Sequence, residues 1–123
     1  MSLEGKCAIV TGAGGGLGRS HALDLARRLN DHLAGVVTAH PRRFAGLGTI
    51  PMQSPDLAIR ELERCVRDLG LSGVEIGSNV NGANLDDPAL EPVWAAADEL
   101  RAFFLVHPHG EIVPGDRDRK SVV

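Results

Sequence analysis

Apolar residues along this chain form four short continuous stretches, separated by three longer segments in which they recur every three or four positions. The short stretches lie at residues 7–10, 44–51, 73–77 and 103–107. Runs of this length predict buried strands, and the wider spacing predicts amphipathic helices. Their alternation predicts a parallel sheet with right-handed crossover connections. Two architectures have this order: a doubly wound sheet and a segment of a (β/α) barrel.

The helical segments have clear ends in the sequence. The first spans residues 17–40, because Pro41 disfavours helix in the residue before it. We expect one long helix here, or two short helices joined near Asn30. The second and third helices are expected to begin at Ser54 and Asp87, where an N-cap residue precedes a proline.

The second helix is rich in charge. Leu62 and Cys65 belong to its apolar stripe, and Gly70 is well placed to cap its C-terminus. We interpret its charged residues, among them Glu61 and Arg64, as a face turned to water and assign them no function.

Composition excludes several classes of protein. Hydrophobic residues make up 43% of the 123 residues and charged residues 24%, as in ordinary globular chains. The net charge is −3 with no basic stripe, so we expect no nucleic-acid partner. No apolar run approaches the roughly 18 residues of a membrane span, and residues 1–10 lack the core of a signal peptide. We therefore expect a cytoplasmic protein without a membrane partner, with Cys7 and Cys65 as buried free thiols.

A glycine-rich turn, "TGAGGGLG", follows the first apolar stretch. Glycines between a strand and a helix let the backbone approach a pyrophosphate at the helix N-terminus. The surrounding "LEGKCAIVTGAGGGLGRSHALDLA" closely resembles the start of short-chain dehydrogenases/reductases. In that family Gly12, Gly16 and Gly18 would contact the dinucleotide.

The dehydrogenase resemblance stops after Arg28. No second strand follows there to hold the adenosine ribose, and the family's catalytic Tyr is absent because the chain contains no tyrosine. We therefore expect weak NAD(P) binding or none, and favour glycines that only close a tight strand-to-helix turn.

A second resemblance covers residues 30–110. It is carried by "NDHLAGVVTAHPRRFAGLGTIPMQ", "ELERCVRDLGLSGVEIG" and "LVHPHG". These pieces resemble amidohydrolase-related proteins of the aminocarboxymuconate-semialdehyde decarboxylase type, in the family's order and spacing. The resemblance implies a metal-dependent (β/α) barrel that decarboxylates or hydrolyses small carboxylated compounds. It also implies that His107 is a ligand of zinc or another divalent metal, at a strand end where barrel active sites lie.

Much of that family's site is missing from the chain. The first barrel strand with its paired histidines is absent, as are the later strands with the catalytic His and the metal-binding Asp. His109 forms an H-x-H with His107 but is not assigned a ligand role, because the family's H-x-H lies on the first barrel strand. A catalytic zinc usually needs three protein ligands, so we assign no catalytic residue and expect weak metal binding and no activity from the chain alone.

The two resemblances together indicate a chimera. Residues 1–29 form a dehydrogenase-like strand, glycine turn and helix start, residues 30–110 a partial amidohydrolase-type barrel, and residues 111–123 a loose tail. The alternatives are an NAD(P)-binding dehydrogenase fragment and a non-catalytic fusion or truncation product.

The expected fold is α/β, with four parallel strands alternating with three helices in a partial (β/α) barrel. Such a sheet has two open edges and an uncovered face, which predicts self-association. Six residues are candidates for the strand positions that face the barrel interior and lose their cover in this chain, although the sequence does not fix their facing: Ile9, Leu47, Val74, Ile76, Phe104 and Val106.

Overall fold

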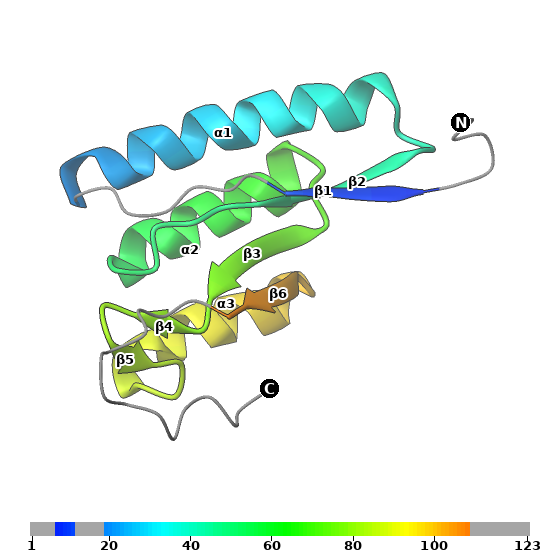
Figure 1. The fold of residues 1–123 in the computed structure, drawn as a ribbon. Coiled ribbons are helices and arrows are strands. Elements are labelled where there is room, and N and C mark those ends of the chain that lie inside the picture. The colour runs from blue at the N-terminus through cyan, green and yellow to red at the C-terminus, as the bar shows by residue number, and fades with distance from the viewer. Residues whose placement is uncertain (1–6, 12–18, 109–123) are drawn as a thin grey trace, which may run out of the picture.

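A computed structural model describes residues 7–11 and 19–108. Its main feature is a four-stranded parallel sheet (Figure 1). The strands are β1 (Ala8–Thr11), β2 (Phe44–Gly48), β3 (Gly73–Gly77) and β6 (Phe103–His107), in the spatial order β1-β2-β3-β6. The order of the strands never reverses, whereas a doubly wound sheet has a point of reversal. The fold is therefore the expected partial barrel, and the doubly wound alternative is wrong.

Three helices connect successive strands of the sheet. They are α1 (Arg19–Ala39), α2 (Pro55–Glu63) and α3 (Glu91–Leu100), and α1 is one continuous helix. A π-helical turn, Arg64–Asp68, continues α2. The chain then passes Gly70 with φ +68°, the left-handed conformation expected of a glycine C-cap. No helix within the described ranges is long and apolar enough to cross a membrane.

The two expected N-caps differ. Asp87 accepts a hydrogen bond from the backbone N–H of Ala89 at 2.9 Å and begins a short 3₁₀ helix, Pro88–Leu90, before α3. Ser54 precedes α2 but its side chain makes no capping hydrogen bond. The proline after each residue marks the helix start correctly, because its fixed φ suits the first turn.

A small antiparallel hairpin follows β3, where the sequence predicted only strands of the main sheet. It consists of β4 (Asn79–Val80) and β5 (Ala83–Asn84). Asn81 and Gly82 join the two strands, with φ +50° and +82°. Two consecutive residues with positive φ suit the right-handed twist of a hairpin, and Asn-Gly adopts them readily.

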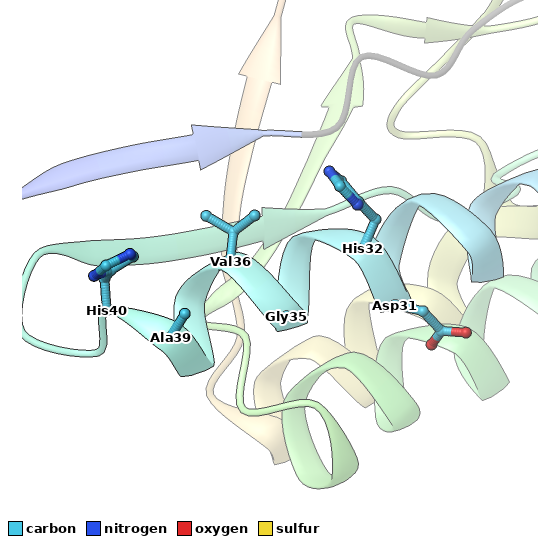
Figure 2. A pocket seen from close by; sticks show the side chains of 6 residues that line it. All are labelled: Asp31, His32, Gly35, Val36, Ala39 and His40. Atoms are coloured by element: carbon cyan, nitrogen blue, oxygen red, sulfur yellow. The ribbon is translucent and has the colours of Figure 1, made fainter.

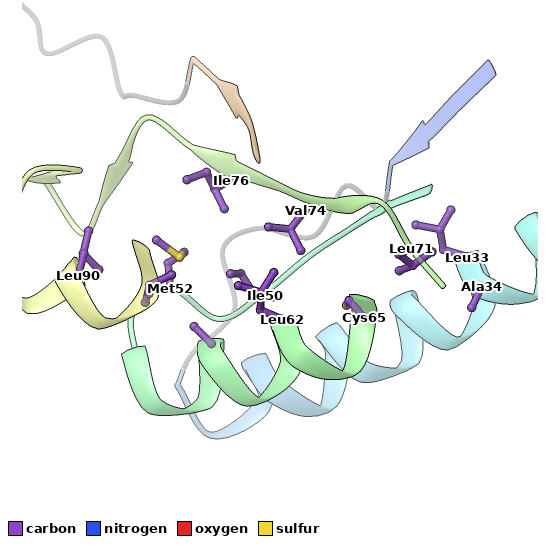
Figure 3. Close-up of a cluster of buried hydrophobic side chains, with 12 residues drawn as sticks. Leu33, Ala34, Ile50, Met52, Leu62, Cys65, Leu71, Val74, Ile76 and Leu90 are labelled. Atoms are coloured by element: carbon purple, nitrogen blue, oxygen red, sulfur yellow. The ribbon is translucent and has the colours of Figure 1, made fainter. Parts of the chain in front are cut away.

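The hydrophobic core lies between the sheet and the helices (Figure 3). Leu62 of α2, Val74 of β3 and Val93 of α3 are completely buried in it. Leu33 and Ala34 join from α1. Side chains of all three helices belong to one core cluster with Val74 and Ile76 of β3, so the three helices cover the same face of the sheet, as in a barrel.

Glycine lets the helix layer approach β2 closely. A Cβ on Gly46 would lie 2.7 Å from a methyl of Leu71 and 2.9 Å from a methyl of Val37 in α1, and a Cβ on Gly48 would lie 2.7 Å from the amide oxygen of Asn30 in the same helix. Both positions therefore face the helices, and neither has room for a side chain.

The opposite face of the sheet leaves apolar side chains exposed on both edge strands, and we call it the open face. Side chains alternate along a strand, so the buried Val74 and Ile76 place Glu75 on this face. By strand register, Phe103, Leu105 and His107 of β6 share it. Phe103 and Leu105 are 54% and 38% exposed.

The six candidate interior-facing positions divide between the two faces. By strand register Ile9 and Leu47 lie on the open face, as expected, with Ile9 65% exposed and Leu47 buried. Val74, Ile76, Phe104 and Val106 lie instead on the helix side, so the expectation is wrong for these four, although Val106 on the edge strand β6 is still 45% exposed.

Phe104 is half-buried against the core. The two cysteines also differ, because Cys65 is buried as expected but Cys7 is exposed. Cys7 precedes the edge strand β1, where its thiol lies 3.5 Å from the carbonyl oxygen of Arg42.

Candidate functional site

His107 is the last residue of β6, at the C-terminal end of the sheet. It is exposed, and its Nδ1 lies 2.8 Å from the carbonyl oxygen of Pro108. A carbonyl oxygen only accepts hydrogen bonds, so this contact places a proton on Nδ1. In the neutral ring, Nε2 then keeps its lone pair. A histidine held this way is suited to bind a metal through Nε2, since ligating histidines commonly donate their other N–H to a backbone carbonyl.

The surroundings of His107 supply few further donors. Gly77, which has no side chain, is its register partner on β3. Glu75 is on the same face, two positions earlier on that strand. In residues 7–11 and 19–108, no group of three or more His, Cys, Asp or Glu side chains could hold a metal ion. His107 therefore fits as one ligand of a metal whose other ligands the described residues do not provide.

The glycine turn is the second site predicted from the sequence. Gly12, Gly16 and Gly18 lie outside the described residues. The elements on either side of them are the expected ones, because β1 ends at Thr11 and α1 begins at Arg19.

A shallow hollow of about 420 Å³ lies along α1 (Figure 2). His32 and His40 project beside it, while Asp31 points away from them. The α1 helix leads into the start of β2, so its C-terminal part lies near the N-terminal end of the strands. In barrel enzymes that end serves stability and the opposite end carries the chemistry. We therefore assign the hollow no catalytic role.

A buried polar network, by contrast, was missed from the sequence. Asn30 is completely buried, and its Nδ2 donates to the Thr49 carbonyl and to Glu61 Oε2, each at 2.8 Å. Its Oδ1 accepts from the Thr49 N–H at 2.8 Å. Thr49 directly follows β2, so Asn30 joins α1 to the C-terminal end of that strand and to α2.

Glu61 is only 2% exposed, which corrects the expectation that it faces water. Arg64 donates to both of its carboxylate oxygens at 2.8 Å, and to Asp31 at 2.6 Å. The hydrogen bond with Glu61 is the main reason that the pKa of Arg64 is raised. The signal was present in the sequence, because Glu61 lies within the apolar stripe, three residues after Ala58 and four before Cys65.

The neighbouring Cys65 thiol is kept neutral. Burial, reinforced by the charge of Glu61, raises its pKa to about 12. Since the thiolate is the reactive form, this cysteine is a core residue and not a nucleophile. The network and Cys65 thus hold the end of β2 in place and leave His107 as the candidate chemical group among the described residues.

Comparison with known proteins places this geometry in a family. Residues 5–121 match the amidohydrolase family (Amidohydro_2). A 2-amino-3-carboxymuconate-6-semialdehyde decarboxylase of Dictyostelium discoideum is 54% identical over 96 residues, which cover 78% of this chain and 26% of that protein. A gamma-resorcylate decarboxylase of Rhodococcus jostii is 36% identical over 103 residues, covering 76% of this chain and 31% of the relative.

Solved structures give the same result. The 5-carboxyvanillate decarboxylase of Sphingomonas paucimobilis superposes with a TM-score of 0.83 at 33% identity, covering 97% of this chain and 36% of that one. The chain therefore spans between a quarter and somewhat more than a third of the relatives it matches. The family match begins at residue 5 and so includes most of the segment that resembles dehydrogenases. On this agreement of sequence and fold, the chain belongs to the amidohydrolase family, as a part of its (β/α) barrel.

Proposed function

We propose that this chain contributes the His107-bearing part of a metal-dependent decarboxylase or hydrolase barrel. The observation that carries the proposal is the position of His107. It ends a parallel strand on the open face, which in a barrel is the interior, and its Nδ1 proton is held by the Pro108 carbonyl. The C-terminal ends of barrel strands are where catalytic groups lie.

The names of the relatives support a small carboxylated substrate. Those reported above are decarboxylases of carboxymuconate-semialdehyde, resorcylate and carboxyvanillate. A dihydroxybenzoic acid decarboxylase of Polaromonas was solved with bound manganese and 2-nitroresorcinol, and it is 34% identical with a TM-score of 0.71. We therefore propose a divalent metal, manganese or zinc, as the cofactor.

His107 would hold this metal through Nε2. A bound divalent ion would supply Lewis-acid polarisation of a substrate oxygen. The chain itself fixes the tautomer of one ligand, through Pro108, and the position of the strand that carries it. One ligand does not make a catalytic site, so we propose that the chain has no activity by itself.

The N-terminal segment has a structural role in this proposal. Residues 1–29 are proposed to derive from a dehydrogenase, with Gly12, Gly16 and Gly18 closing the turn between β1 and α1 without binding NAD(P). The support is the position of β1, which pairs in parallel with β2 as the barrel requires. Titration calorimetry with NAD and NADP tests this part. Saturable binding that is lost in Gly16→Val would instead favour a dinucleotide-binding fragment.

Self-association and a cytoplasmic location complete the proposal. The exposed apolar side chains of the open face support the first, and the free Cys7 and Cys65 thiols are compatible with the second.

Metal binding by the purified chain tests the central claim. After dialysis against manganese or zinc, elemental analysis should show less than one metal per chain. The small amount bound should fall in His107→Ala and be retained in His32→Ala, a matched control on the exposed surface of α1. With 2,6-dihydroxybenzoate and manganese, the chain should release no carbon dioxide. Tight binding of one metal per chain that survives His107→Ala would overturn the assignment of His107.

A further inference from the structure

We propose that a second copy of this chain covers the open face, with β6 of each copy pairing with β1 of the other. The product is a closed eight-stranded barrel made of two identical halves. The inference extends the proposed self-association by naming its surface and its geometry. It rests on the fold and requires no metal.

The first support is the asymmetry of the sheet. One face packs against three helices, while the other leaves Ile9, Phe103 and Leu105 in water at both edges. Burying such a side chain is worth roughly 1.5–3 kcal/mol. These side chains lie on the two edge strands that the second copy would meet, so closure of the barrel would remove them from water.

The second support is the hydrogen bonding of the two edge strands, β1 and β6. Among residues 7–11 and 19–108, β1 pairs with β2 alone and β6 with β3 alone. The Ala8 N–H donates to Arg43 at the β2 side, so the Ile9 N–H points away from β2. Likewise the Phe103 N–H donates to Ser72 at the β3 side. The Phe104 and Val106 N–H groups therefore point outward.

The outward backbone groups of β6 could form hydrogen bonds with those of β1 in a second copy. The strands have four and five residues, and both run in the direction of the sheet. A junction of β6 with β1 of a second copy would be another parallel pair, like the three pairs already present. Unpaired edges of this kind promote pairing with another chain.

Strand number favours a second copy as the occupant. Four sequential parallel strands with all helices outside are half of an eight-stranded barrel. A two-fold axis makes both junctions identical and closes the assembly.

Closure has a consequence for the candidate site. All eight strands would end at one rim, and each copy would bring its own His107 to that rim. The partner copy would thus add a second imidazole to a site that one chain leaves incomplete.

Light scattering coupled to size exclusion tests the proposal on the full chain. The expected mass is twice the 13.0 kDa of one chain. Leu105→Glu places a charge on the open face and should weaken the dimer at least 100-fold. Ala95→Glu makes the same kind of change at an exposed position of α3 and should leave the dimer intact. Ile9→Lys should act as Leu105→Glu does, from the other edge strand.

A further variant tests the edges separately. Val106→Pro removes an outward N–H and should also yield monomers, whereas a face-to-face stack of two sheets would survive it. Fluorescence of the single Trp94 and circular dichroism show that each variant is folded. A monomeric wild type, a polydisperse aggregate, or a dimer indifferent to Leu105→Glu would overturn the proposal. A dimer that is lost in Leu105→Glu but kept in Val106→Pro would overturn the closed barrel.

Discussion

The two faces of the sheet are both rich in apolar side chains, yet they have opposite surroundings. On the helix side, Val74 and Ile76 are 0% and 4% exposed. On the open side, Phe103 and Leu105 of the neighbouring strand β6 remain in contact with solvent. Parallel strands of a complete barrel are buried on both faces and are apolar on both. In this chain, therefore, one face supplies the stability of the fold, and the other is available for partners and chemistry.

The largest effect should come from the helix side. Leu62 is completely buried in the core, so Leu62→Ala should lower the free energy of unfolding by about 2–5 kcal/mol. Leu105→Ala removes the same atoms from the open face. At concentrations where the monomer predominates, it should change this free energy by less than about 0.5 kcal/mol. Urea denaturation of both variants measures the difference, and equal losses would contradict the distinction between the faces.

A smaller loss of unfolding free energy is expected at the buried polar network, where the helices meet the C-terminal end of β2. Asn30→Ala would leave the Thr49 backbone groups and the Glu61 carboxylate without the amide that now pairs with them. Leaving buried polar groups unpaired costs about 1–3 kcal/mol, and more for charged ones.

Asn84→Ala is the matched control, because Asn84 is exposed in the hairpin after β3. Its stability should match that of the wild type within about 0.5 kcal/mol. If Asn30→Ala were equally harmless, the network would not hold the end of β2, and the position of the rim would need another explanation.

The two cysteines show the same contrast between a buried and an exposed position, here in the reactivity of their thiols. The pKa of Cys65 is raised from its ordinary 9.0 to about 12, so the unfolded thiol ionises before the folded one. Its contribution to stability is therefore complete below about pH 9 and is lost as the pH rises toward 12. The decline of unfolding free energy over this range should be shallower in Cys65→Ala.

At neutral pH, iodoacetamide should modify the exposed Cys7 and not Cys65 until the chain unfolds, as mass spectrometry would show.

The sequence predicted the elements of this fold better than the direction of their side chains. Strand order and helix positions follow from apolar runs, Pro41 and Gly70, whose effects are local. The side of the sheet on which Ile9 and Val74 lie could not be predicted from the sequence. A strand with apolar residues on both sides has no alternating pattern to indicate which side is covered.

Two local features were also missed. Asn81-Gly82 is a strong hairpin signal, yet no strand was expected between the third apolar stretch and the third helix. Glu61 was interpreted by its charge, although its helical phase placed it in the core. For the site, the resemblance to amidohydrolase-related proteins singled out His107, and the apolar run before it predicted its place at the end of a strand. Its hydrogen bond to Pro108 depends on side-chain and backbone geometry that no sequence pattern specifies.

The smallest effect is expected at the exposed end of the polar network. Arg64 contacts Glu61, whose side chain is 2% exposed, and Asp31, whose side chain is 59% exposed. An exposed ion pair contributes about 0.2–1 kcal/mol, since water screens the charges and two side chains lose freedom. Asp31→Ala should therefore lower the unfolding free energy by no more than about 1 kcal/mol, and about 1 M salt should abolish the difference from wild type. Denaturant titrations at low and high salt measure this, with Asp56→Ala as the control on the first turn of α2. A loss as large as that of Asn30→Ala, and insensitive to salt, would mean that Asp31 belongs to the buried network and that the boundary between core and solvent lies farther out along Arg64.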